Sequence, residues 1–153
     1  MNIEPLNPKS TAAQALIAES DAYMAALYPA ESNHMESSKA LALPNVVFLG
    51  GYIEGELVAC GAVKTLTDDG TYGEIKRLFV LESHRGKGLS KAIMQRLEAH
   101  LKNSGVRIVR LETGIKQPEA LGLYNKLAYV ERGPFGSYSR DPLSVFMEKR
   151  LEA

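Results

Sequence analysis

The junction at residues 78–90 constrains this chain more than any other segment of its sequence. Leu78-Phe79-Val80 is typical of the end of a strand, and Gly86-Lys87-Gly88 precedes a run with apolar residues at helical spacing. The apolar stripe of that run consists of Leu89, Ile93, Met94, Leu97 and Leu101. A strand that passes through glycines into an amphipathic helix predicts a fold in which helices pack on a sheet.

Patterns elsewhere in the chain predict the remaining elements. Strands are expected at 1–6, 45–53, 56–66, 72–80, 106–112, 129–132 and 144–151. Helices are expected at 11–28, at 38–43, from Leu89 to the stop signal Asn103-Ser104-Gly105, and at 118–127. Only Glu54-Gly55 separates two of the strands, which indicates a tight hairpin. The order of these elements predicts a mixed sheet in an α/β or α+β layered fold.

Composition excludes several classes of protein. The 153 residues fit one domain over 1–153, whose core needs no disulfide or metal. Eighteen Lys and Arg balance eighteen Asp and Glu, and this zero net charge argues against a nucleic-acid partner. Cys60 is the only cysteine, which excludes disulfide scaffolds and cysteine zinc sites and fits a reducing compartment. His84 and His100 lie far apart in the sequence, and we expect no metal site.

No segment of the sequence predicts export or membrane insertion. The N-terminus lacks a basic region followed by an apolar stretch, and the longest apolar-rich run, 46–53, is too short to span a bilayer. We therefore expect a soluble, cytoplasmic protein without a membrane partner. A homodimer is compatible with the sequence, which does not determine the oligomeric state.

The glycine-rich junction is also the best candidate for a binding site. The first turn of a helix has unsatisfied N–H groups and a partial positive charge, and Arg85 and Lys87 add cations beside it. Glycines allow a phosphate group to approach that backbone, although Gly86 and Gly88 could equally form only a tight turn. The pattern is not a Walker loop, which needs four residues between its glycines and then Lys followed by Ser or Thr. It is not G-x-G-x-x-G either, because Lys91 stands where the third glycine would be.

Two segments carry a family resemblance. Residues 85–90, Arg-Gly-Lys-Gly-Leu-Ser, resemble motif A of the GNAT superfamily of acetyl-CoA-dependent N-acetyltransferases, Q/R-x-x-G-x-G/A, with Ser90 departing at the last position. Residues 117–129 are similar to the GNAT helix pattern N-x-x-A-x-x-L-Y-x-x-x-G-F, with Gln117 at the Asn position and Ala128 at the Gly position. The element order fits as well. The resemblance, to small single-domain bacterial members, implies a mostly antiparallel sheet of six to seven strands with helices on both faces.

The resemblance also implies where coenzyme A would bind. In GNAT enzymes the backbone amides of motif A hold the pyrophosphate, a role that falls here on Arg85, Gly86, Lys87, Gly88, Leu89 and Ser90. The pantetheine arm pairs with the end of the fourth strand, here Leu78, Phe79 and Val80. A backbone N–H on that strand could polarise the thioester carbonyl. Gln117 is expected to hydrogen-bond the pantetheine.

Catalytic and acceptor-binding residues follow from the same resemblance, each beside a structural alternative. Tyr124 would donate a proton to the leaving thiolate, although an aromatic residue at helical spacing is commonly part of the core. Glu74 lies where some GNAT enzymes place a general base, but it could equally form an ordinary ion pair. Glu31, Asn33 and His34 lie in the loop expected to cover the acceptor, and a polar loop is often only solvated.

The sequence thus favours an N-acetyltransferase that moves an acetyl group from acetyl-CoA to a primary amine of a small molecule or peptide, by direct attack in a ternary complex. The alternative is a non-catalytic acyl-CoA-binding sensor or interaction module on the same fold, which would keep motif A without the proton-transfer groups Tyr124 and Glu74. A mononucleotide-binding domain is a third interpretation, weakened by the absence of a Walker lysine.

Overall fold

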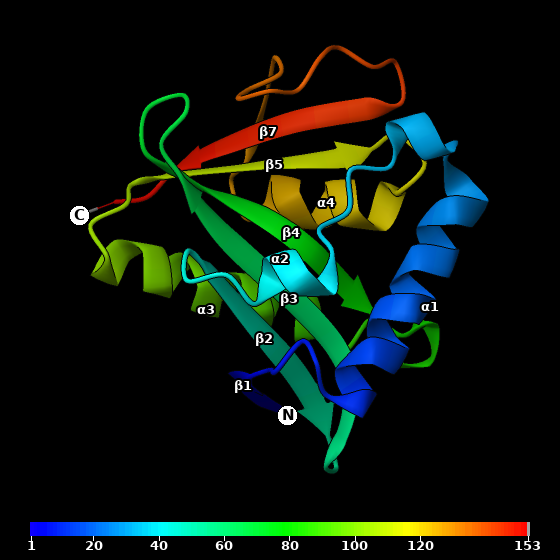
Figure 1. The fold of residues 1–153 in the computed structure, drawn as a ribbon. Helices are drawn as coiled ribbons and strands as arrows, with labels where there is room; N and C mark the ends of the chain where they lie inside the picture. The colour runs from blue at the N-terminus through cyan, green and yellow to red at the C-terminus, as the bar shows by residue number, and fades with distance from the viewer. Residues whose placement is uncertain (153) are drawn as a thin grey trace.

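A seven-stranded sheet forms the centre of the molecule, and helices cover both of its faces (Figure 1). The computed structural model describes residues 1–152. The strands are β1 (Asn2–Pro5), β2 (Val46–Ile53), β3 (Glu56–Leu66), β4 (Tyr72–Val80), β5 (Ile108–Gly114), β6 (Val130–Arg132) and β7 (Ser144–Arg150). Their order is β1-β2-β3-β4-β5-β7-β6, and every pair is antiparallel except β4–β5. The expected mixed, mostly antiparallel sheet is confirmed.

Each face of the sheet has its own helices and its own core. The helices are α1 (Thr11–Leu27), α2 (Ser38–Leu41), α3 (Leu89–Asn103) and α4 (Pro118–Lys126), with 3-10 turns η1 (Ala30–Ser32) and η2 (Glu82–His84). On one face α1 and α2 pack on Phe48, Cys60 and Ala62. On the other face the apolar stripe of α3 packs on Leu49 and Val63. These residues alternate along β2 and β3, as the period of two in a strand requires.

The sheet divides between β4 and β5. These two strands pair only over Gly73–Ile75 of β4 and then diverge, as Figure 1 shows. Two residues further along, Arg77 has a positive φ of 56°, and the β3–β4 register shifts between Cys60 and Ala62. Such a bulge bends a strand away from its neighbour. The Arg77 guanidinium, 8% exposed as a residue, donates to Asp21 Oδ1 at 2.6 Å and therefore ties the bulge to α1.

Strand β5 is the element whose position differs most from the prediction. It covers Ile108–Gly114 rather than 106–112, because Val106 N–H donates to the Leu101 carbonyl at 2.9 Å and so belongs to the end of α3. The shift of two residues brings Thr113 and Gly114 into the strand. Both therefore lie at the end of β5 that diverges from β4.

Candidate active site

One cavity of about 640 Å³ lies where β4 and β5 separate. The residues around it come from the N-terminus of α3, the second half of β4, the end of β5, α4, and α1 with the loop that follows it. Segments far apart in the sequence therefore share one space. Cavities of this size accommodate small molecules and cofactors.

The α3 end of the cavity is built from backbone. Gly88 is the N-cap of the helix with a φ of 80°, and no side chain caps the first turn. An added Cβ at Gly86 or Gly88 would meet nothing within 4 Å, so the space beside these residues is open. Gly86, Gly88, Leu89 and Ser90 line the cavity, and the free amides of a helix N-terminus suit an anionic group.

The two cations of the junction have different surroundings. Arg85 lines the cavity, donates from Nε to the Val80 carbonyl at 3.1 Å, and places its guanidinium 4.9 Å from the centre of the Tyr23 ring. Lys87 is exposed and is not among the residues that line the cavity. Only Arg85 of the pair is therefore held in place beside the cavity.

The wall next to this junction is an open strand edge. Leu78, Phe79 and Val80 all line the cavity, and in the described chain the β5 side of β4 has no strand partner beyond Ile75. Backbone groups on this edge are available to an extended ligand, in the manner of an added strand. Gln117 lines the same cavity, and its Oε1 accepts a hydrogen bond from the Tyr28 hydroxyl at 3.2 Å. Within residues 1–152 its amide NH₂ has no hydrogen-bond acceptor, so it can donate to a ligand.

Tyr124 is the buried hydroxyl of the site. The residue is 6% exposed, lines the cavity, and packs its ring edge-on against Tyr129 with centroids 5.9 Å apart. Within residues 1–152 its hydroxyl has no hydrogen-bond partner. Burial raises the pKa of this hydroxyl, so the oxygen keeps its proton. A protonated, unpartnered hydroxyl facing a cavity can donate to a ligand.

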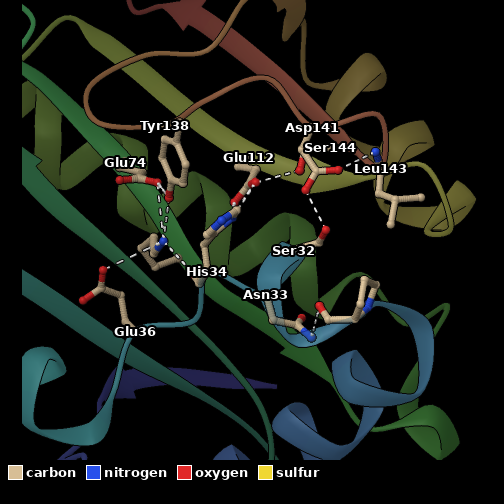
Figure 2. A network of polar contacts seen from close by, with 12 residues as sticks. Ser32, Asn33, His34, Glu36, Glu74, Glu112, Tyr138, Asp141, Leu143 and Ser144 are labelled. Atoms are coloured by element: carbon tan, nitrogen blue, oxygen red, sulfur yellow. Dashed lines mark hydrogen bonds and ion pairs between the residues drawn. The ribbon is translucent and has the colours of Figure 1, made fainter.

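A chain of polar contacts closes another part of the cavity (Figure 2). His34 Nδ1 lies 2.9 and 2.8 Å from the two carboxylate oxygens of Glu112, and the Ser144 hydroxyl donates to Glu112 Oε2 at 2.8 Å. Nearby, the Ser32 hydroxyl donates to Asp141 Oδ2 at 2.6 Å. These contacts join the loop after α1 to β5 and to the segment before β7.

Glu74 belongs to the same network, which it joins through Lys76 and Tyr138 (Figure 2). It is buried and accepts hydrogen bonds from the Tyr138 hydroxyl and, at 3.5 Å, from Lys76 Nζ. Burial raises the pKa of its carboxyl group, and the nearby Lys76 ammonium partly offsets that rise. Lys76 lines the cavity whereas Glu74 does not, so Glu74 supports the wall from behind.

The three loop residues expected to bind the acceptor differ in position. His34 lines the cavity, whereas Glu31 and Asn33 do not. Glu31 is exposed. Asn33 donates from Nδ2 to the Tyr28 carbonyl at 3.2 Å, so it shapes the turn after α1, and its buried Oδ1 has no partner in residues 1–152.

Sequence reasoning assigned no role to three residues that the structure places in the cavity wall, Tyr28, Glu112 and Ser144. The only sequence signal for Glu112 is a carboxylate at the end of the predicted strand. Over residues 1–152 no group of three or more His, Cys, Asp or Glu side chains is arranged to hold a metal ion. In the same span no helix is both long and apolar enough to cross a membrane.

Comparison with known proteins identifies this arrangement. A profile of the acetyltransferase (GNAT) family matches residues 13–129. The chain belongs to the GNAT acetyltransferase family. It is 43% identical over 145 residues to the IAA acetyltransferase of Azospirillum brasilense, which covers 95% of this chain and 94% of the relative. The predicted family is therefore confirmed, and the chain is an acyltransferase.

Solved structures agree with this membership. A crystal structure from Klebsiella pneumoniae, of a protein assigned to the acyl-CoA N-acyltransferases, is 35% identical with a TM-score of 0.83 and covers 99% of this chain and 97% of its own. The PaiA N-acetyltransferase of Thermoplasma acidophilum, crystallised with coenzyme A, is 18% identical with a TM-score of 0.70, covering 98% of this chain and 99% of its own. The second match shows the shared GNAT fold.

Proposed function

We propose that this GNAT protein transfers an acetyl group from acetyl-CoA to a primary amine of a small molecule or peptide. The observation that carries the proposal is the single cavity that joins the open N-terminus of α3 to Tyr124 and to the polar wall at His34 and Glu112. One end suits a phosphate, the buried hydroxyl suits a leaving group, and the polar wall suits an amine.

The donor half of the cavity fits coenzyme A. Its pyrophosphate would accept hydrogen bonds from the amides of residues 86–90, with the Arg85 guanidinium as a counter-charge. The pantetheine arm would lie along Leu78–Val80, where the strand edge is free, and would accept a hydrogen bond from the Gln117 amide. A β4 backbone N–H would then stabilise the oxyanion that forms at the thioester carbon.

The position of Cys60 favours direct attack over an acetyl-cysteine intermediate. Cys60 is fully buried beneath α1, and burial raises the pKa of its thiol to about 12. It does not line the cavity, and the sequence contains no other cysteine. The amine would therefore attack the thioester in a ternary complex of protein, donor and acceptor.

Magnitudes show which proton transfer needs more help from the protein. A lysine-like amine has a pKa of about 10.4, so deprotonating it at pH 7 spans about 3.4 units and costs about 4.6 kcal/mol at about 1.36 kcal/mol per unit. The leaving thiol has a pKa of about 8.5, so its thiolate can leave without full protonation, and the departure of the thiolate needs less help than the deprotonation of the amine. The contribution of Tyr124 is then a hydrogen bond to a charged sulfur, about 1.5–3 kcal/mol, or about 10- to 100-fold in rate.

A matched pair of tyrosine variants tests the proposal. Free-thiol release from acetyl-CoA is measured with a panel of amines for wild type, Tyr124→Phe and Tyr129→Phe, together with urea unfolding. Tyr124→Phe should lower kcat about 10- to 100-fold and leave the free energy of unfolding within about 0.5 kcal/mol of wild type, because no protein hydrogen bond is lost.

Tyr129→Phe should behave in the opposite way. Its hydroxyl donates to Glu98 Oε2 at 2.8 Å outside the cavity, so the change should cost about 1–3 kcal/mol of stability and leave kcat unchanged. Wild-type kcat in Tyr124→Phe would contradict the general-acid role. Coenzyme A binding without thiol release for any amine would instead support the non-catalytic sensor.

A further inference from the structure

The pair formed by His34 and Glu112 has a geometry that amine binding alone does not explain. The Nδ1 atom of His34 lies within 2.9 Å of both oxygens of Glu112. The Glu112 side chain is only 11% exposed, whereas the His34 side chain is 35% exposed. The carboxylate thus lies behind the imidazole, and both residues line the cavity.

This geometry selects one tautomer of the imidazole. A carboxylate only accepts hydrogen bonds, so its partner Nδ1 must carry a proton. The Ser144 hydroxyl donates to Glu112 Oε2 at 2.8 Å and helps to fix the orientation of the carboxylate. In neutral His34 the lone pair therefore resides on Nε2. A histidine whose Nδ1 is held by a carboxylate in this way is arranged to take up a proton at Nε2.

Two further contacts hold His34 in place. The backbone carbonyl of His34 accepts a hydrogen bond from Lys76 Nζ at 2.8 Å, and the ring packs edge-on against Tyr138 with centroids 5.3 Å apart. Lys76 and Tyr138 are in turn hydrogen-bonded to each other at 2.8 Å. A base held in place by several contacts loses little freedom when the acceptor binds.

We propose that His34 is the general base of the reaction and that Glu112 is its positioning residue. This inference rests on the proposed function and extends it to the acceptor amine. The acceptor ammonium gives one proton to His34 Nε2, and the freed nitrogen lone pair forms a bond to the thioester carbon. The C–S bond breaks, and its electron pair leaves on sulfur.

The proton balance of the reaction closes without another reactant. The thiolate takes a proton from the Tyr124 hydroxyl, which regains one from solvent. The amide nitrogen releases its second proton to solvent, and His34 later does the same. The net change converts ammonium and thioester to amide, thiol and one free proton.

Glu74 is the competing candidate for the base, and its contacts argue against it. It does not line the cavity, and Lys76 and Tyr138 both donate to its carboxylate. A proton on its way from the acceptor would have to pass Lys76, which is itself an ammonium.

Charged groups from three parts of the chain surround His34. The Glu112 carboxylate from β5 contacts the ring at Nδ1, the Asp141 carboxylate lies nearby before β7, and the Lys76 ammonium from β4 contacts the backbone carbonyl. The Tyr138 hydroxyl is directed to Glu74 instead.

The test compares two acceptors of different basicity. Thiol release is measured for wild type, His34→Gln and His34→Ala with an alkyl amine, which is an ammonium at pH 7, and with an aromatic amine, which is already neutral. Any amine pair that wild type accepts will serve. His100→Gln is the matched control, because His100 lies on α3 and does not line the cavity.

A base is needed only where the acceptor carries the extra proton. His34→Gln should lower kcat for the alkyl amine by about 10²–10⁴-fold and lower it much less for the aromatic amine, with coenzyme A affinity unchanged. Added imidazole should restore part of the activity of His34→Ala, and raising the pH should restore part of the alkyl-amine activity of His34→Gln. Glu112→Gln should lower kcat with the same preference for the alkyl amine, because an amide can donate to Nδ1 and favour the wrong tautomer.

Two results would overturn the inference while leaving acetyl transfer intact. One is an equal loss of kcat for both amines in His34→Gln, which a merely structural role would produce. The other is the basicity-dependent loss appearing in Glu74→Gln and not in His34→Gln. Failure of the proposed function is distinct, since wild type itself would then release no thiol with any amine, and the inference would fall with it.

Discussion

Replacing Gly114 by alanine would test how β5, α1 and α4 together shape the cavity. An added Cβ at Gly114 would lie 1.8 Å from the Tyr28 hydroxyl oxygen, 2.2 Å from Cζ and 2.8 Å from Cε1. Ordinary contact begins at 3.4 Å, so moving the oxygen from 1.8 Å to that distance requires a retreat of about 1.6 Å. Tyr28 is only 5% exposed and has little room to move.

The retreat would break two hydrogen bonds. The Tyr28 hydroxyl donates to Gln117 Oε1 at 3.2 Å and accepts from the Lys116 N–H at 3.1 Å. Their loss should cost about 1–3 kcal/mol, and overpacking should cost about 1–3 kcal/mol more. The gain from replacing a flexible glycine is only about 0.4–1 kcal/mol. We therefore expect Gly114→Ala to lower the free energy of unfolding by about 2–5 kcal/mol and to weaken coenzyme A binding through Gln117.

Urea unfolding in two backgrounds measures the clash directly. Tyr28→Leu removes the hydroxyl, Cζ and Cε1 together, so Gly114→Ala should cost less than about 1 kcal/mol in that background. Isothermal titration calorimetry with coenzyme A reports on Gln117. An equal cost of Gly114→Ala in both backgrounds would refute the argument, because the destabilisation would then come from the β5 backbone and not from Tyr28.

Two further predictions concern the donor site and Glu74. Gly88 and Gly105 lie at opposite ends of α3, with φ of 80° and 78° and open space around both. Replacing either by valine should therefore lower the free energy of unfolding by about 1–2 kcal/mol. Only Gly88→Val should abolish coenzyme A binding in calorimetry. Burial raises the pKa of Glu74 in the folded state above its value in the unfolded chain. The contribution of Glu74 to stability is therefore fully present below the unfolded-state pKa, and it is lost as the pH rises through the folded-state pKa. Urea unfolding from about pH 4 to about pH 8 should show wild type losing stability relative to Glu74→Gln, and a constant difference would contradict the raised pKa.

The part of the cavity wall that we assign to the donor could be predicted from the sequence because its elements are local. Strand β4, the glycine turn and α3 are consecutive, and backbone amides bind phosphate whatever the side chains are. The helix motif at residues 117–129 is informative even where it departs from the family pattern. Ala128 stands where that pattern has glycine, and it has a positive φ of 74°, which explains the preference for glycine at this position.

The acceptor half could not be predicted in the same way, because its contacts are not local. His34 and Glu112 are 78 positions apart, and Ser32 and Asp141 are 109 apart. The two-residue error in β5 placed its end at Glu112, and no periodicity marks which carboxylate faces a cavity. Glu74 illustrates the same limit, since its place on β4 is clear from the sequence but its burial behind Lys76 and Tyr138 is not.

The two halves therefore differ in what a family likeness can transfer. In the function that we propose, donor recognition would depend on the split between β4 and β5 and on the open end of α3, which are properties of the fold. In the function that we propose, acceptor recognition would depend on two loops, after α1 and before β7, that contact each other through Ser32 and Asp141. Side chains in such loops can change without altering the sheet, since the core lies elsewhere. Likeness to other GNAT structures is thus good evidence for the donor and weak evidence for the acceptor, whose identity has to be established with this protein's own His34 and Glu112 variants.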